Sequence, residues 1–232
     1  MLCSGVKYDL PVVGAYFIFK TWLEDPSPLP VEPAPPIVGV NVTPPIVGDE
    51  VAPYIVGGDL AAPGSAPYMV ALFLRGLFSC GGSLISARTV LTAAHCISEK
   101  VPSIHHGLVG TNLLNWGGTE IFFERLISHP NYVAQPNLVM NDIGLLITTA
   151  AVQFSALVRP VALSYQRLGA GVSVRANGWG NTQAHVSLSN ELLELFMTSI
   201  DDQQCKDSIP QSIVDSVSIV CAVHSVNHGM CN

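Results

Sequence analysis

Hydrophobic and polar positions alternate in short runs along the chain from residue 55 onward. The runs are four to nine residues long and are separated by Gly, Pro, Asn or Ser clusters, a pattern typical of strands joined by turns. No amphipathic stretch of three helical turns occurs; only residues 201–206, which begin with two aspartates, predict a short helix. The pattern predicts an all-β fold, a sandwich or a barrel. The expected strands are 68–74, 89–92, 120–127, 143–148, 172–176, 192–200 and 217–223.

The first 54 residues have a different character. Ten of the 17 prolines lie within residues 1–53, and residues 24–53 carry proline in place of apolar periodicity, which predicts an extended segment. A repeat of nine residues begins at Ala34, Thr43 and Ala52. We interpret it as a duplication of the sequence that opens the domain, with a low-complexity linker as the alternative. The sequence therefore predicts an N-terminal Pro-rich segment, 1–54, followed by a domain over 55–232.

An apolar run at 11–19 resembles the hydrophobic part of a secretory signal. Asp9 before it, the proline within it and Lys20 after it argue against that interpretation, so the signal is not convincing. A pro-segment is the other interpretation of residues 1–54.

Composition and charge exclude several classes of function. Charged residues make up 12% of the chain and the net charge is -7, which excludes a protein that neutralises nucleic-acid phosphates. No stretch of 18 apolar residues is free of charged or amide side chains, so we expect no membrane span. The mean hydropathy of +0.42 and the 20 glycines indicate a globular body rich in buried strands.

The six cysteines form no C-x-x-C pair, so neither a zinc ribbon nor a thioredoxin-type site is predicted. Cys80 with Cys96, and Cys205 with Cys221, would close loops of equal length. In a weakly charged, Gly-rich chain such cysteine spacing is typical of a secreted, disulfide-bonded protein.

Two positions are candidates for catalytic chemistry. His95 precedes Cys96, and a disulfide at that cysteine would hold the imidazole in place, as a general base requires. Asp142 stands before an apolar strand, where a carboxylate needs a partner such as a histidine N–H. Taken singly, a histidine of this kind is usually a structural one, and Asp142 could equally be a turn cap.

Six motifs in a fixed order make the pattern specific. They are Ile55-Val56-Gly57-Gly58, Cys80-Gly81-Gly82-Ser83-Leu84-Ile85, Leu91-Thr92-Ala93-Ala94-His95-Cys96, His129-Pro130-Asn131-Tyr132, Asp142-Ile143-Gly144-Leu145-Leu146 and Gly178-Trp179-Gly180. With these motifs in this order, the chain resembles the trypsin/chymotrypsin family of serine endopeptidases throughout 55–232. The resemblance implies that His95 is the general base and that Asp142 holds its tautomer and stabilises the imidazolium.

The nucleophile of the family does not occur in this sequence. It lies in a Gly-Asp-Ser-Gly-Gly motif, and residues 229–232 match the positions just before it, so we expect the serine and the oxyanion-hole N–H groups beyond Asn232. The resemblance implies two six-stranded antiparallel β-barrels, the second incomplete. It also implies a secreted serine endopeptidase, inactive in the chain as given. A non-catalytic homologue that acts as a binding or regulatory protein is the alternative, and an incomplete sequence is the third interpretation.

The resemblance also assigns specificity and partners. Gly229 occupies the base of the primary substrate pocket and carries no charge, which implies a chymotrypsin-like preference for large apolar side chains. Cleavage after Tyr54 would make Ile55 the new N-terminus of a zymogen. We expect protein or peptide substrates, protease inhibitors as further partners and a monomer when completed. No cofactor is expected, and no metal, since residues 110–120 lack the calcium-binding glutamates of some members.

Several residues are expected to have no part in catalysis. Cys3 and Cys231 have no family partner within the sequence and are expected to stay unpaired, beside disulfides Cys80–Cys96 and Cys205–Cys221. His105 and His106 are expected as an exposed loop pair. His224 and His228 are expected at the surface, and Trp116 and Trp179 are expected to pack or to form loops.

Overall fold

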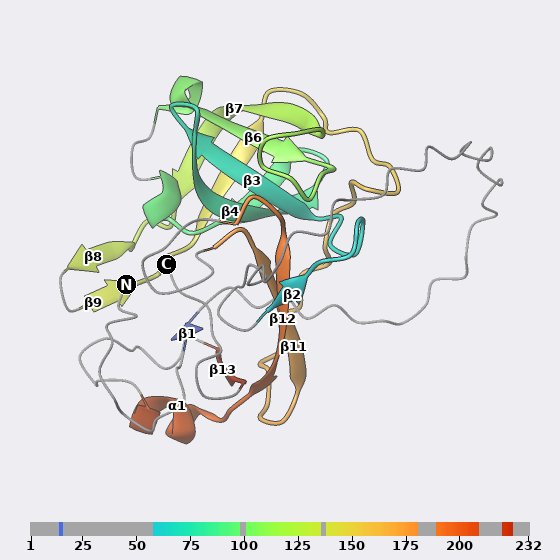
Figure 1. The fold of residues 1–232 in the computed structure, drawn as a ribbon. Helices are drawn as coiled ribbons and strands as arrows, with labels where there is room; N and C mark the ends of the chain where they lie inside the picture. The colour runs from blue at the N-terminus through green and yellow to red at the C-terminus, as the bar shows by residue number, and fades with distance from the viewer. Residues whose placement is uncertain are drawn as a thin grey trace, which may run out of the picture.

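The computed structural model describes residues 14–15, 58–97, 101–135, 138–180, 189–208 and 220–224. Strands dominate it, which confirms the predicted all-β fold (Figure 1). One α-helix, α1 (Asp202–Ser208), lies where the two aspartates predicted it. No helix in the described part of the chain is long and apolar enough to cross a membrane.

Six strands close into an antiparallel barrel in the order β10-β5-β4-β3-β6-β7. Alternating side chains on these strands enter the barrel, so that β6 and β10 show a strictly alternating burial pattern. The enclosed core includes Val70, Leu84 and Leu146, each with 0% exposure. The strands are β3 (Met69–Leu74), β4 (Leu77–Ser86), β5 (Thr89–Thr92), β6 (His105–Val109), β7 (Thr119–Ser128) and β10 (Gly144–Thr148).

The hairpin between β3 and β4 shows how the sequence fixes the register. Leu74 pairs with Leu77, and the two residues between them, Arg75 and Gly76, have φ angles of 52° and 79°. Positive φ at both central positions makes a type I′ turn, whose twist matches that of the flanking strands.

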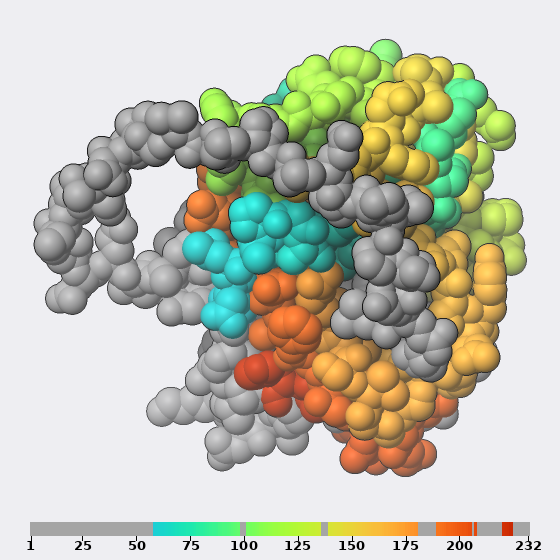
Figure 2. Space-filling model, turned by 90° about the vertical axis from the view of Figure 1, so that its right-hand side faces the viewer, coloured from blue at the N-terminus to red at the C-terminus, as the bar shows by residue number. Residues whose placement is uncertain are grey.

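A second sheet lies below the barrel in Figure 1 and has five strands, in the order β1-β13-β12-β11, with β2 also paired to β12. In the described ranges this sheet is open. Figure 2 shows the residues after Gly58 (cyan) against the orange residues of this sheet. The strands are β1 (Gly14–Ala15), β2 (Asp59–Leu60), β11 (Ser173–Gly178), β12 (Leu193–Ser199) and β13 (Cys221–Val223).

Trp179 joins the two sheets. Its side chain is 2% exposed and belongs to a core cluster that contains Met69 and Ala71 from β3 and Leu192 before β12. Its Nε1–H donates to the carbonyl oxygen of Asn112 at 2.8 Å. Trp179 therefore packs, as the sequence predicted, while Trp116 is 76% exposed.

The expectation for His105 and His106 is wrong. Both lie in β6, and His105 is only 4% exposed, with Nδ1 at 2.9 Å from the carbonyl oxygen of Val101. The His106 ring stacks on Phe73 of β3 with 4.8 Å between ring centroids. The pairing of β6 with β3 and β7 overrides the low strand propensity of this polar run.

The two C-terminal histidines expected at the surface are His224 and His228. His224 is exposed, as expected for a surface histidine. His228 lies outside the described residues.

Candidate active site

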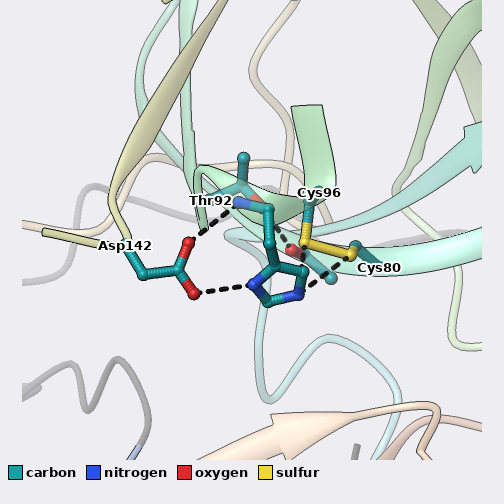
Figure 3. The surroundings of a disulfide bond; sticks show 6 residues. Cys80, Thr92, Cys96 and Asp142 are labelled. Atoms are coloured by element: carbon teal, nitrogen blue, oxygen red, sulfur yellow. Dashed lines mark hydrogen bonds and ion pairs between the residues drawn. A yellow bond between two sulfur atoms is a disulfide. The ribbon is translucent and has the colours of Figure 1, made fainter. Parts of the chain in front are cut away.

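His95 is positioned by the end of β5 and by a covalent bond. The strand ends at Thr92, and His95 opens the single-turn 3₁₀ helix η1 (His95–Ile97). Cys96, in the same turn, forms a disulfide with Cys80 of β4, with 6.1 Å between their Cα atoms. The Thr92 hydroxyl donates to the carbonyl oxygen of Gly81 at 2.9 Å, so the turn is tied to β4 on both sides of the histidine (Figure 3).

Asp142 lies between the short hairpin of β8 (Val133–Gln135) and β9 (Leu138–Met140) and the first residue of β10. The residue before it, Asn141, has a φ of 52°, a conformation that asparagine tolerates better than most residues. The Asn141 side chain donates from Nδ2 to the carbonyl oxygen of Asn131 at 2.9 Å. This turn redirects the chain and aims the Asp142 carboxylate at η1.

The structure brings His95 and Asp142 together, although 47 positions separate them in the sequence. His95 Nδ1 lies 2.7 Å from Asp142 Oδ2, and the backbone N–H of His95 donates to Oδ1 at 2.8 Å. Figure 3 shows both contacts converging on the carboxylate. Since an ionised carboxylate only accepts hydrogen bonds, Nδ1 carries the proton and Nε2 of the neutral ring keeps its lone pair.

The two side chains differ in accessibility. The imidazole is 46% exposed and the carboxylate 26%. Nε2 lies 3.4 Å from Cys96 Sγ and 4.0 Å from Cys80 Sγ, but a disulfide sulfur has no proton to donate. Nε2 therefore remains able to accept a proton from a reacting group.

The charge on Asp142 is stabilised by its surroundings. Burial raises the pKa of its carboxyl, but hydrogen bonds from the ring and backbone of His95, the charge of His95 and the Ala94 backbone N–H together lower that pKa below its ordinary value. The pKa of Tyr132 is raised, first by burial and then by the negative charge of Asp142. Sequence reasoning did not single out Tyr132 as a neighbour of the site, because its proximity to Asp142 arises only in the fold.

Gly144 lets β10 approach η1. A Cβ atom at this position would lie 2.6 Å from Ile97 Cδ1, closer than such atoms can pack. Ile97 is fully buried and follows His95 in the same turn. The glycine two residues after Asp142 thus sets the separation between the elements that carry the two side chains.

Both expected disulfides are present. Besides the Cys80–Cys96 bond, Cys205 of α1 is bonded to Cys221 of β13, and both residues are buried. Ile55, Gly229, Cys3 and Cys231 lie outside the described residues, so the activation junction, the substrate pocket and the two remaining cysteines stay predictions.

One group of potential metal ligands occurs in the described ranges. Cys80, His95 and Cys96 place their ligand atoms within 4.8 Å of one another. Both sulfurs are committed to the disulfide, so neither is a thiolate, the form in which cysteine binds metals. The donor set does not fit a resident metal ion.

Comparison with known proteins places this chain in a family. The family model described as Trypsin matches residues 55–232. "Serine protease SP24D" of Anopheles gambiae is 35% identical over 176 residues, covering 75% of this chain and 62% of that protein. Human "Granzyme M" is 35% identical over 161 residues, covering 68% of this chain and 62% of that protein. The chain thus spans about 62% of the length of these relatives.

A solved structure gives the same result for the fold. The chain of neuropsin, described as a serine protease expressed in the limbic system of mouse brain, superposes with a TM-score of 0.66 at 28% identity. The match covers 73% of this chain and 74% of the neuropsin chain.

Proposed function

Since the chain belongs to the trypsin family of serine proteases, we propose that it carries the base half of a serine endopeptidase active site. The observation that supports this most strongly is the 2.7 Å contact between His95 Nδ1 and Asp142 Oδ2, which leaves Nε2 available on an accessible ring. In this role His95 takes the proton of a nucleophilic serine and returns it to the leaving amine. Asp142 fixes the tautomer and stabilises the imidazolium.

The nucleophile is the missing part of this machinery. No Gly-Asp-Ser or G-x-S-x-G sequence occurs among the 232 residues, so we propose that the serine and the oxyanion-hole donors lie downstream of Asn232. Loss of the nucleophile from such a triad lowers turnover by about 10⁶-fold. The 232-residue chain by itself is therefore expected to be inactive.

The finer assignments rest on the family resemblance. The functional domain begins at Ile55, which becomes the N-terminus after cleavage behind Tyr54 of a secreted zymogen. Gly229 offers no charge to a substrate, and an unpaired Lys or Arg side chain in a buried pocket is strongly disfavoured. The completed enzyme is therefore proposed to be a monomer that cleaves proteins or peptides after large apolar residues and that binds protein inhibitors of proteases.

The test begins with the transcript downstream of the Asn232 codon. A Gly-Asp-Ser-Gly-Gly continuation supports the enzyme, whereas glycine in place of the serine supports the non-catalytic homologue. The completed protein and its His95→Ala variant are then assayed on matched peptides ending in Phe or Arg. We expect hydrolysis after Phe that the variant loses, and no hydrolysis by the 232-residue chain. Cleavage after Arg would overturn the specificity, and inhibitor-sensitive activity of the 232-residue chain would overturn the downstream nucleophile.

A further inference from the structure

A pocket with a volume of about 300 Å³ lies on the closed barrel, where β3 begins and β6 ends. Its walls come from the segment that leads into β3, from the loop 110–118 between β6 and β7, and from the segment that follows β10. None of these belongs to the open second sheet. In the barrel β3 and β6 lie across from β10 and β5, the strands that flank Asp142 and His95, so the pocket is separate from the candidate active site. Its apolar side chains include those of Pro63, Pro67, Met69, Leu113, Trp116 and Leu157.

We propose that this pocket is a binding site for a small, uncharged aromatic molecule, and that Trp116 is the ring on which this molecule stacks. Pockets for small ligands begin at about this volume, and they are lined mainly by apolar side chains with a few polar groups. The proposal goes beyond proteolysis and does not rest on it.

The walls of the pocket carry no charge. All the residues that line it are described, and none of them is Asp, Glu, Lys, Arg or His. Its two polar side chains are already engaged within the chain. Thr111 Oγ1 donates to the carbonyl oxygen of Trp116 at 3.0 Å, and Asn112 Nδ2 donates to that of Ala61 at 2.7 Å. A charged ligand would lose its hydration without gaining a partner of opposite charge, so an uncharged ligand is favoured.

Trp116 is held in place although its side chain is exposed. The Thr111 hydroxyl fixes the carbonyl group of Trp116 and also accepts the N–H of Leu113 at 3.0 Å. The loop is tied down again by the N–H of Leu114, which donates to the carbonyl oxygen of Asn190 at 2.9 Å. An accessible indole on an ordered loop offers a stacking face, and little further ordering is needed when a ligand binds.

The barrel favours a small molecule over an extended peptide as the ligand. β3 pairs with β4 and β6, and β6 pairs with β3 and β7, so neither strand has a free edge. Extended peptides commonly bind through main-chain hydrogen bonds to such an edge. The pocket offers burial of apolar surface and ring stacking instead, and a compact aromatic molecule can use both.

Titration of the full chain with indole tests the site, with NMR chemical shifts of the amides of 110–118 as the readout. We expect saturation with a Kd of about 1 mM or lower, which is within the range that so small a ligand can reach by burial. The shifts should be confined to residues around the pocket. Absence of saturation at about 10 mM indole would overturn the proposal.

Two variants test the stacking role of Trp116. Trp116→Ala should weaken indole binding by at least about tenfold, because it removes the ring on which the ligand stacks. The ring is exposed, so this variant should fold like the parent, as unchanged amide shifts in β10 would show. The matched control is Tyr165→Ala, which removes an exposed ring outside the pocket and should bind indole like the parent. Equal affinities of Trp116→Ala and the parent would overturn the site.

Three further probes test the class of ligand. Indole-3-acetate and cyclohexanol should each bind at least about fivefold more weakly than indole, the first because its carboxylate finds no partner and the second because it has no aromatic face. Equal binding of indole-3-acetate would overturn the preference for an uncharged ligand, and equal binding of cyclohexanol would overturn the preference for an aromatic one. A capped peptide with a central tryptophan should bind no more tightly than indole. Much tighter binding of this peptide would overturn the small molecule and identify a peptide as the ligand.

Discussion

At the scale of single residues, the carboxylate of Asp142 is the group whose ionisation the fold controls most clearly. Its pKa is depressed in the folded chain, so its contribution to stability is complete above the unfolded value of about 4 and is lost as the pH falls through the folded value. We expect Asp142→Asn to lower the free energy of unfolding at neutral pH by about 1–2 kcal/mol, because charge-assisted bonds to His95 are weakened. Urea unfolding between pH 3 and pH 7 measures both effects.

The matched control for Asp142 is Glu120→Gln, which neutralises an exposed carboxylate on β7. Glu120→Gln should lose stability at acid pH as the parent chain does, whereas Asp142→Asn should lose less. Equal pH profiles for the two variants would show that the pairing with His95 does not stabilise the fold. In the completed enzyme Asp142→Asn should also lower kcat by about 10⁴-fold, since the ring would adopt the wrong tautomer.

At the scale of elements, the site depends on how closely β10 approaches η1. Gly144→Ala would place a methyl group 2.6 Å from Ile97 Cδ1 and 3.2 Å from Ile97 Cγ1. Overpacking of this kind costs about 1–3 kcal/mol, and the displaced turn is the one that carries His95. Thermal or urea unfolding measures the loss. Gly169→Ala, where nothing lies within 4 Å of the added Cβ, is the control and should unfold like the parent.

The elements also show what the sequence could predict. Strands with clear apolar runs, such as β5 and β10, were located within a residue, and ordered motifs brought His95 and Asp142 into one site. β6 was missed because its two histidines and a glycine resemble a loop, and only pairing with β3 and β7 makes it a strand. The bond from the His95 backbone N–H to Asp142 was also missed, since it requires the η1 turn. β1 was missed because its pairing with β13, far away in the sequence, exists only in the assembled sheet.

At the scale of the whole molecule, Trp179 ties the closed barrel to the second sheet. Its ring is buried, and its centroid lies 6.0 Å from that of the Phe78 ring of β4. Its N–H donates to the carbonyl oxygen of Asn112, in the loop between β6 and β7. Trp179→Phe removes this donor, leaves the Asn112 carbonyl without its indole partner and opens a void beside the β3 residues of the shared cluster. We expect a loss of about 2–4 kcal/mol in the free energy of unfolding.

The proposed role of Trp179 has a built-in comparison in Trp116, which lies on the surface with 76% exposure. Trp116→Phe makes the same chemical change without removing a buried contact, so we expect less than about 0.5 kcal/mol. Hydrogen exchange extends the comparison, because loss of a contact between the sheets should raise exchange in β12 as well as in β3. If Trp179→Phe loosened β3 alone, the two sheets would be held together by other contacts and the tryptophan would serve only the core of the barrel. Loosening on both sides is the result expected, since Trp179 follows β11 directly and shares its cluster with β3 residues and with Leu192, the residue before β12.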